Sequence, residues 1–146
     1  MIYLDTSLLL KLYAHEHGSE QLAAWLIGKS TWCCARHGRL ELVSALKRHQ
    51  REGRISPQGI RQALARLDAD EKTQLIEWLS VSDELIDSAC TTFVALPPTV
   101  FLRAADALHL ACAKAAGLKE IYSHDDHLLA AAPHFKLKGV DVLKAH

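Results

Sequence analysis

Several features that would point to a membrane or secreted protein are missing from this chain of 146 residues. No run approaches the ~18 apolar residues that a membrane-spanning helix needs. The start, Met1 to Asp5, has no basic leader before an apolar stretch, so we expect no secretory signal. Linkers, repeats and low-complexity segments are also absent from the sequence. These absences favour a single cytoplasmic domain that spans residues 1–146.

Cysteine is scarce, and none of its positions forms a C-x-x-C pair. The four residues are Cys33, Cys34, Cys90 and Cys112. An adjacent pair is poorly placed for an ordinary disulfide or a zinc knuckle. We therefore expect all four thiols to fill the core, and nothing in their spacing suggests an oxidising compartment.

The chain has no net charge, but its charges are unevenly distributed. Residues 36–66 contain eight Lys or Arg against two Glu, a local charge of +6, whereas residues 67–90 contain seven acids against one Lys, a local charge of −6. One interpretation is that these are solvated faces of surface helices. The other is a basic flank beside an acidic cleft, which would suit a polyanion. Charge alone does not decide between them.

The apolar pattern predicts strands that alternate with helices, typical of a parallel α/β sheet with helices on both faces. The expected helices begin near Thr6, Ser19, His37, Pro57, Asp83, Leu102 and Asp126. The expected strands are residues 2–4, 31–35, 75–81, 121–123 and, at the sheet edge, 140–143. Ligands of such sheets bind beyond the carboxyl ends of the strands.

Four acids occur in segments that this fold would bring to that edge: Asp5, Glu41, Asp106 and Asp125. Gathering carboxylates in one cleft is costly unless protons or a cation neutralise them. Oxygen ligands suit a hard divalent cation such as Mg²⁺ or Mn²⁺. The four acids therefore predict a metal site suited to phosphate chemistry.

Each acid also has a structural interpretation. Asp5 could cap a helix, although Thr6 or Ser7 could do so equally. Asp106, in an apolar helix, could face water beside Arg103. Glu41, on a basic helix, could pair with a neighbouring arginine or lysine, namely Arg39, Lys47 or Arg48. Asp125 lies nearer the strand end than Asp126, so we favour Asp125 at the site and expect Asp126 to face solvent.

The histidines offer an alternative metal site. His109 follows Asp106 at i+3, and His124 and His127 bracket the Asp pair, so zinc is conceivable. However, the H-E-x-x-H motif is absent, and His109 fits a packed helix residue. We therefore favour a site made of oxygen ligands alone.

The motifs resemble those of a known family. They are Leu4-Asp5-Thr6-Ser7, Leu40-Glu41-Leu42, the stretch from Arg103 to Ala111, and Ile121 to Asp125. In this order, over nearly the whole chain, they resemble a PIN-domain ribonuclease, and are most similar to the VapC-type toxins of bacterial toxin–antitoxin pairs. The most specific parts are Asp-Ala-Leu-His-Leu-Ala and the N-terminal Leu-Asp-Thr-Ser.

The resemblance implies a three-layer α/β/α fold with a central parallel sheet, and an acidic quartet around Mg²⁺ or Mn²⁺ that hydrolyses RNA phosphodiesters. It further implies inhibition by a cognate antitoxin, and dimerisation. Thr6 and Ser123 match the small hydroxyl positions that support such sites, where the family more often has Thr in place of Ser123. From their charge, we expect the RNA backbone to contact the helix that carries Arg36, Arg39, Lys47, Arg48 and Arg51.

Other functions fit less well. A binding module that keeps the fold without turnover is an alternative, but all four acids are present. A haloacid-dehalogenase phosphatase would need a second Asp two residues after Asp5, where this chain has Ser7. A receiver domain would need an acidic pair at the first strand end, and only Asp5 is there. The sequence identifies neither the RNA target nor the antitoxin.

Overall fold

The computed structural model describes residues 1–144. Helices and strands alternate along the chain, in this order: β1 (Ile2–Tyr3), α1 (Thr6–Tyr13), α2 (Ser19–Leu26), β2 (Trp32–Ala35), α3 (His37–Arg51), α4 (Pro57–Lys72), β3 (Ile76–Leu79), α5 (Asp83–Val94), α6 (Ala104–Ala115), β4 (Glu120–Tyr122), α7 (Asp126–Ala131), the 3-10 turn η1 (Ala132–Phe135) and β5 (Lys138–Val140). The expected α/β class is confirmed. No helix among residues 1–144 is long and apolar enough to cross a membrane.

All strand pairs are parallel, as predicted. β2 lies between β1 and β3, and β4 pairs with β5. A bridge between Leu4 and Tyr122 joins the two groups, and the Asp5 amide donates to the Tyr122 carbonyl at 3.1 Å. The strands therefore follow the order β3-β2-β1-β4-β5, and the chain after β1 and β4 leaves the same edge.

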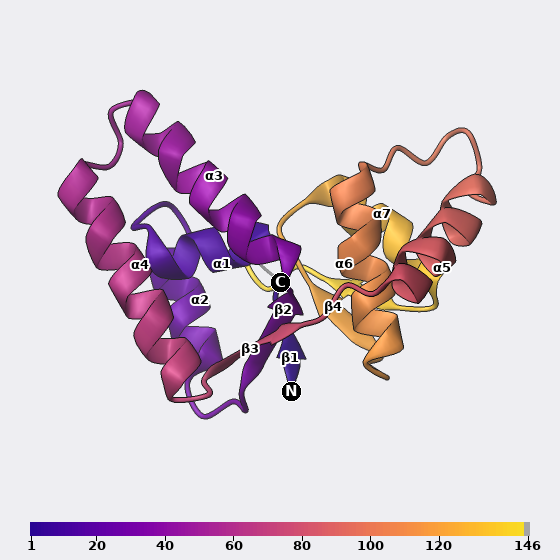
Figure 1. The fold of residues 1–146 in the computed structure, drawn as a ribbon, viewed down its shortest axis with the longest axis horizontal. Coiled ribbons are helices and arrows are strands. Elements are labelled where there is room, and N and C mark those ends of the chain that lie inside the picture. Colours follow the sequence, from indigo (N-terminus) through magenta and orange to yellow (C-terminus); the bar gives the residue numbers. More distant parts are fainter. Residues whose placement is uncertain (145–146) are drawn as a thin grey trace.

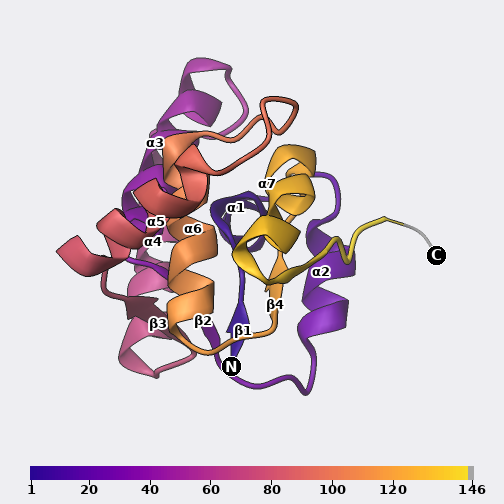
Figure 2. The ribbon, with the colours of Figure 1, turned by 90° about the vertical axis from the view of Figure 1, so that its right-hand side faces the viewer.

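Helices cover both faces of this sheet. In Figure 1, α1 to α4 lie on one side of the strands and α5 to α7 on the other. Figure 2 brings the second layer to the front, with α5, α6 and α7 over the strands. Side chains alternate between the two layers, as the pleat of a strand requires. Tyr3 and Cys33 enter the core under α6, whereas Leu4 and Cys34 enter the core under α1 and α3.

Two sequence expectations need correction. The last strand is Lys138–Val140 rather than 140–143, since Tyr122 pairs with Val140 and the Leu143 amide then turns back to Asp141 Oδ1 at 2.9 Å. Such an aspartate-centred turn ends a strand. Of the four cysteines expected in the core, three are buried, but Cys90 is exposed on the outer face of α5.

Candidate metal centre

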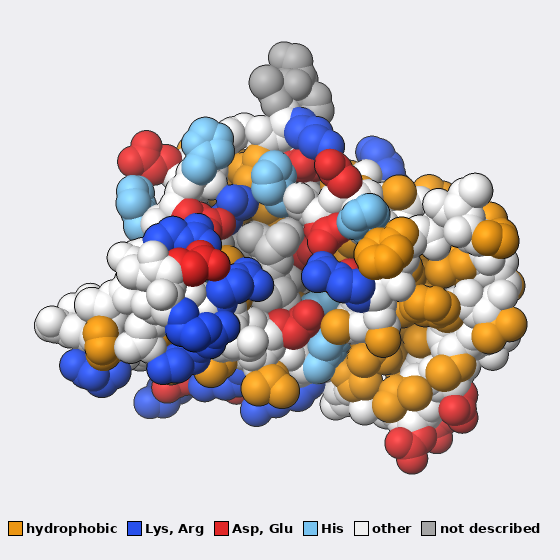
Figure 3. All heavy atoms as spheres, turned by 90° about the horizontal axis from the view of Figure 1, so that it is seen from above, with side chains coloured by type: hydrophobic (Ala, Val, Ile, Leu, Met, Phe, Trp, Pro, Cys, Tyr) orange, Lys and Arg blue, Asp and Glu red, His pale blue; other side chains and the backbone are white. Residues whose placement is uncertain are grey.

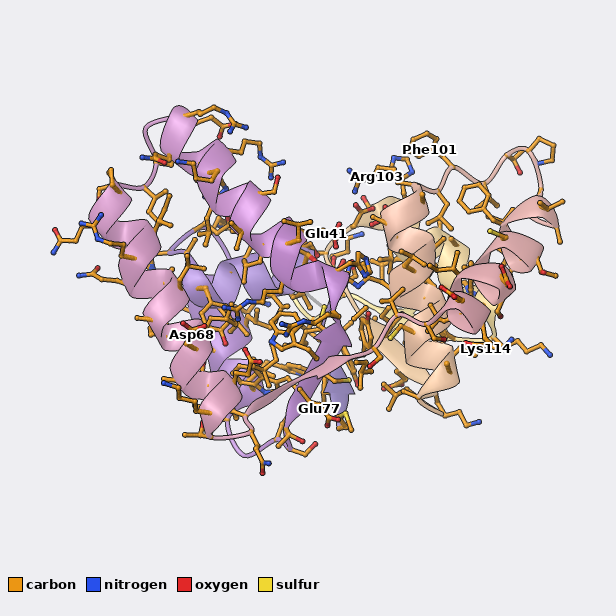
Figure 4. The ribbon with its side chains drawn as sticks, in the orientation of Figure 1. Glu41, Asp68, Glu77, Phe101, Arg103 and Lys114 are labelled. Atoms are coloured by element: carbon orange, nitrogen blue, oxygen red, sulfur yellow. The ribbon has the colours of Figure 1, made fainter. Side chains whose placement is uncertain are left out.

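The four predicted acids line one pocket, which has a volume of about 650 Å³. It opens above the carboxyl ends of β1 and β4, between α3 and the start of α6. In Figure 4, Glu41 on α3 faces Arg103 at the start of α6 across this opening. Figure 3 looks onto the same surface, where acidic and basic side chains surround a hollow. Segments separated by up to 120 residues of sequence thus meet at one site.

Asp5 lies at the bottom of the pocket and is buried. It caps α1, because its Oδ1 accepts from the Leu8 amide at 3.2 Å. Two hydroxyls also donate to it: Ser7 Oγ to Oδ1 at 2.6 Å, and Ser123 Oγ to Oδ2 at 2.5 Å. Burial raises the pKa of Asp5, although its hydrogen bonds from Ser123, Ser7 and the Leu8 amide oppose the effect. The cap role and a place in the pocket are therefore compatible.

Glu41 reaches the pocket from α3. Its Oε1 accepts from Thr6 Oγ1 at 3.0 Å and lies 2.6 Å from His109 Nε2 and 3.5 Å from His37 Nε2. Burial by itself raises the pKa of Glu41, but the hydrogen bonds from His109 and Thr6 outweigh it, so the pKa is lowered. The alternative that Glu41 pairs with Arg39, Lys47 or Arg48 is wrong. Its contacts are Thr6, His109 and, four residues earlier on the same helix, His37.

Asp106 and Asp125 share a single cation, Arg103. Asp106 is buried in the first turn of α6 and accepts from Arg103 Nε at 3.0 Å. Arg103 Nη2 donates to Asp125 Oδ2, also at 3.0 Å. Asp125 caps α7 as well, accepting through Oδ1 from the amides of His127 and Leu128. The alternative that Asp106 simply faces water is wrong, although Arg103 does contact it.

Asp126 lies outside the pocket, as predicted. It is exposed, and its Oδ1 accepts from Lys144 Nζ at 2.6 Å. The two adjacent aspartates therefore differ in surroundings: Asp125 faces the acidic pocket and Asp126 faces a lysine on the surface. The hydrogen bond and charge of Lys144 lower the pKa of Asp126.

The supporting hydroxyls divide between the acids. Thr6 contacts Glu41, and Ser123 contacts Asp5 while also accepting from the Asp125 amide at 2.9 Å. The sequence analysis missed Ser7, which donates to Asp5 and accepts from the His124 amide. Its position two residues after Asp5, directly after Thr6, could have indicated that the Ser7 hydroxyl supports the site.

The predicted RNA-contacting residues separate into two groups. Arg48 lines the pocket, and Lys47 and Arg51 are exposed nearby on α3. Arg36 and Arg39 instead pair with acids of α4: Arg39 lies 2.7 Å from Asp68 and 3.0 Å from Glu71. The sequence analysis missed Arg54 and Lys11, which also line the pocket.

The donor set fits a hard divalent cation. The carboxylates are the oxygen ligands that Mg²⁺ and Mn²⁺ prefer. Asp5 is a buried carboxylate held only by uncharged hydrogen-bond donors, and Arg103 already contributes a positive charge to two of the acids. Within residues 1–144 there is also a mixed cluster, His37, Glu41 and His109, whose ligand atoms lie within 4.8 Å of one another.

Comparison with known proteins agrees with this geometry. The PIN domain family model matches residues 2–133. Ribonuclease VapC35 of Mycobacterium tuberculosis, found in two strains, is 33% identical over 149 residues, and the match covers 96% of each chain. The crystal structure of M. tuberculosis VapC20, described as a Sarcin-Ricin loop cleaving toxin, superposes with a TM-score of 0.69 at 19% identity, over 90% of this chain and 95% of that one. At that identity the structural match supports the fold. The family model and the VapC35 match show that this chain belongs to the PIN-domain family.

Proposed function

We propose that this protein is a metal-dependent endoribonuclease that acts as the toxin of a toxin–antitoxin pair. The observation that carries the proposal is the convergence of Asp5, Glu41, Asp106 and Asp125 on one pocket. Its VapC35 relative is named a ribonuclease, and the match spans both chains almost completely. The binding-module alternative predicts the same fold without turnover, so activity decides between the two.

The chain's own residues have distinct roles in this proposal. Asp5 and Asp106 would hold the ion, and Glu41 would complete its coordination directly or through water. Asp125 would hold a second ion or orient the attacking water. The chemistry that Mg²⁺ or Mn²⁺ would supply there is polarisation of the scissile phosphate and a lower pKa for the attacking water. The hydroxyls of Ser7, Ser123 and Thr6 fix the carboxylate orientations before the ion arrives.

RNA enters from the basic side of the pocket. Arg48 and Arg54 line the pocket, and Arg51 lies close by on the last turn of α3. Contacts of arginine with phosphate position the strand without specifying its sequence. Arg36 and Arg39 are excluded from this role in the proposal, because Asp68 and Glu71 already neutralise them.

A cognate antitoxin, a homodimer and a cytoplasmic location complete the proposal. Dimerisation is supported by exposed apolar side chains on α5 and in the loop after it, including Val94, which is 87% exposed, and Phe101, which is 61% exposed. Figure 3 shows a broad apolar area on the side of the molecule where α5 lies. The dimer is tested by measuring the molar mass of the wild type and of Val94→Lys by light scattering. We expect the mass of a dimer only for the wild type.

The test of the activity is cleavage of total cellular RNA by antitoxin-free protein. With Mg²⁺ or Mn²⁺ we expect defined products that disappear with EDTA and with Asp106→Asn, which removes a ligand charge but keeps the side-chain size. We expect Asp106→Asn to cleave RNA at least about 100-fold more slowly than the wild type. This is at or above the usual effect of removing a residue that only supports a metal ligand. Absence of products from every RNA class, with Mn²⁺ still bound, would favour the binding module.

Two charge-reversal variants on α3 test the proposed path of the RNA. Arg48→Glu should weaken RNA binding about 3- to 10-fold at low salt and reduce the salt slope by about 1. Arg39→Glu makes the same charge change where α4 already supplies acids, and should leave RNA binding nearly unchanged. Equal effects of the two variants in a filter-binding titration would discard this path.

A further inference from the structure

His109 occupies an unexpected place in the acidic site. The sequence interpretation treated it as a packed helix residue, and it is indeed only 1% exposed. Yet each ring nitrogen contacts a polar group from another element: Nδ1 lies 2.8 Å from Tyr3 Oη on β1, and Nε2 lies 2.6 Å from Glu41 Oε1 on α3. The ring therefore connects a buried phenol to a carboxylate of the candidate metal centre.

The direction of these hydrogen bonds follows from the backbone. The amide of Ala35 donates to Tyr3 Oη at 2.9 Å, so the tyrosine proton is left to point toward His109 Nδ1. A phenol is protonated at neutral pH, so Tyr3 keeps this proton. Nδ1 must then accept, and the ring proton resides on Nε2, which donates to Glu41.

We propose that Tyr3 and His109 are positioning residues for Glu41. Every polar contact described for this carboxylate within residues 1–144 involves Oε1, from Thr6, His109 and His37. With Oε1 held by the donors Thr6 and His109, Oε2 is the atom offered to a cation in the pocket. The assignment rests on the proposed function, in which Glu41 is a ligand. In this assignment, the series of hydrogen bonds from the Ala35 amide through Tyr3 and His109 fixes the orientation of the Glu41 carboxylate.

Packing holds the ring in this orientation. The centroid of the His37 ring lies 4.3 Å from that of His109, and Tyr3 meets the ring edge-on at 5.9 Å. Gly38 lets α3 approach closely, because a Cβ there would lie 2.5 Å from Cys34 Sγ and 3.2 Å from His109 Cε1. A ring so enclosed cannot turn over without moving α3 or β2, so the hydrogen-bond direction is built into the fold.

The same geometry argues against a transition-metal site formed by His37, Glu41 and His109. His37 Nε2 lies 3.0 Å from the Ala105 carbonyl, to which it must donate. His109 Nε2 carries its proton toward Glu41. The Nε2 hydrogen of His37 points to the Ala105 carbonyl and that of His109 points to Glu41, so neither nitrogen offers the lone pair that a metal requires.

The first test determines which ring nitrogen of His109 is protonated, by long-range ¹H–¹⁵N NMR of the histidine rings in the metal-free protein. We expect the ring proton of His109 on Nε2 and the lone pair on Nδ1. A ring protonated on Nδ1 would overturn the proposal, as would Zn²⁺ that binds to His37 and His109 in the same spectra. This reading does not depend on whether the protein cleaves RNA.

The second test measures Mn²⁺ affinity by electron paramagnetic resonance, beside RNA cleavage. His109→Leu removes the donor and should weaken Mn²⁺ binding about 10- to 100-fold, the usual effect of losing such a support. His109→Gln keeps a donor near the Nε2 position and should restore most of the affinity. Tyr3→Phe should weaken Mn²⁺ binding several-fold and lower kcat, with KM for RNA unchanged.

Tyr13→Phe is the matched control, since it removes another tyrosine hydroxyl, which donates to Asp70 Oδ2 at 2.7 Å at the opposite end of α1 from Asp5. It should bind Mn²⁺ like the wild type. Wild-type affinity in a folded Tyr3→Phe or His109→Leu would overturn the positioning role, and so would a loss as large in Tyr13→Phe. Failure of the wild type to cleave RNA, with these Mn²⁺ effects intact, would instead count against the proposed function.

Discussion

The two sides of the acidic pocket are held by different kinds of donor. On one side, Asp5 and Glu41 accept from hydroxyls, a backbone amide and a histidine ring. On the other, Asp106 and Asp125 share the guanidinium of Arg103. Hydroxyl donors orient a carboxylate but leave its charge uncompensated, whereas an arginine both orients and neutralises it. In the proposed metal centre, the first side is thus preorganised for a cation, whereas the second would exchange the arginine for the metal ion.

Among variants of the residues that donate to the four acids, we expect a large loss when a hydroxyl donor is removed. Ser123→Ala removes the donor to Asp5 Oδ2 and also the acceptor of the Asp125 amide. We expect Mn²⁺ affinity and RNA cleavage to fall about 10-fold or more. Ser123→Thr keeps the hydroxyl and should retain both. If Ser123→Ala and the wild type bind Mn²⁺ equally in a calorimetric titration, the hydroxyls are only structural.

Removing Arg103 should raise the affinity for Mn²⁺, whereas removing a hydroxyl donor should lower it. Arg103→Gln takes away the charge that competes for Asp106 and Asp125, so Mn²⁺ should bind more tightly. The side chain of Arg103 is 65% exposed, so its ion pairs are worth at most about 1 kcal/mol, or a factor of about five. Arg36→Gln, an exposed arginine paired with α4, is the control. Weaker Mn²⁺ binding in Arg103→Gln would contradict the distinction between the two sides.

The smallest effect concerns the stability of the metal-free protein. Burial raises the pKa of Asp5, so its contribution to folding is most favourable below the ordinary aspartate range, about pH 4, and is lost as pH rises through the folded-state pKa. In EDTA at neutral pH, Asp5→Asn should therefore melt a few degrees higher than the wild type. The difference should shrink in acid.

A matched control for that experiment is Asp87→Asn, which makes the same change at an exposed position of α5. It should leave the melting temperature unaltered at both pH values. A wild type more stable than Asp5→Asn in EDTA at neutral pH would show that the hydrogen bonds of Asp5 outweigh its burial.

Much of this arrangement could be predicted from sequence because strand ends are local features. Asp5 and Asp125 each follow a short apolar strand, and the topology of a parallel sheet brings such ends to one edge. The acidic quartet in one pocket is thus a consequence of the fold. The last strand was misplaced because a short apolar pattern does not fix where a turn such as that at Asp141 ends the pairing.

Contacts between side chains of separate helices could not be predicted in the same way. The basic run on α3 is continuous in sequence, but Arg39 meets Asp68 of α4 while Arg48 reaches the pocket. Likewise, the sequence spacing of Tyr3, Glu41 and His109 does not predict that their side chains form one hydrogen-bonded chain. Such pairs depend on how helices pack across the sheet, which composition and periodicity do not encode.

The most direct test of the metal centre is a crystal of the protein grown with Mn²⁺ and measured at a wavelength where manganese scatters anomalously. The account predicts a manganese peak within coordinating distance of Asp5 and Asp106, with the Arg103 guanidinium moved away from Asp106. At saturating Mn²⁺, an empty acidic pocket, or a peak only at His37 and His109, would contradict it.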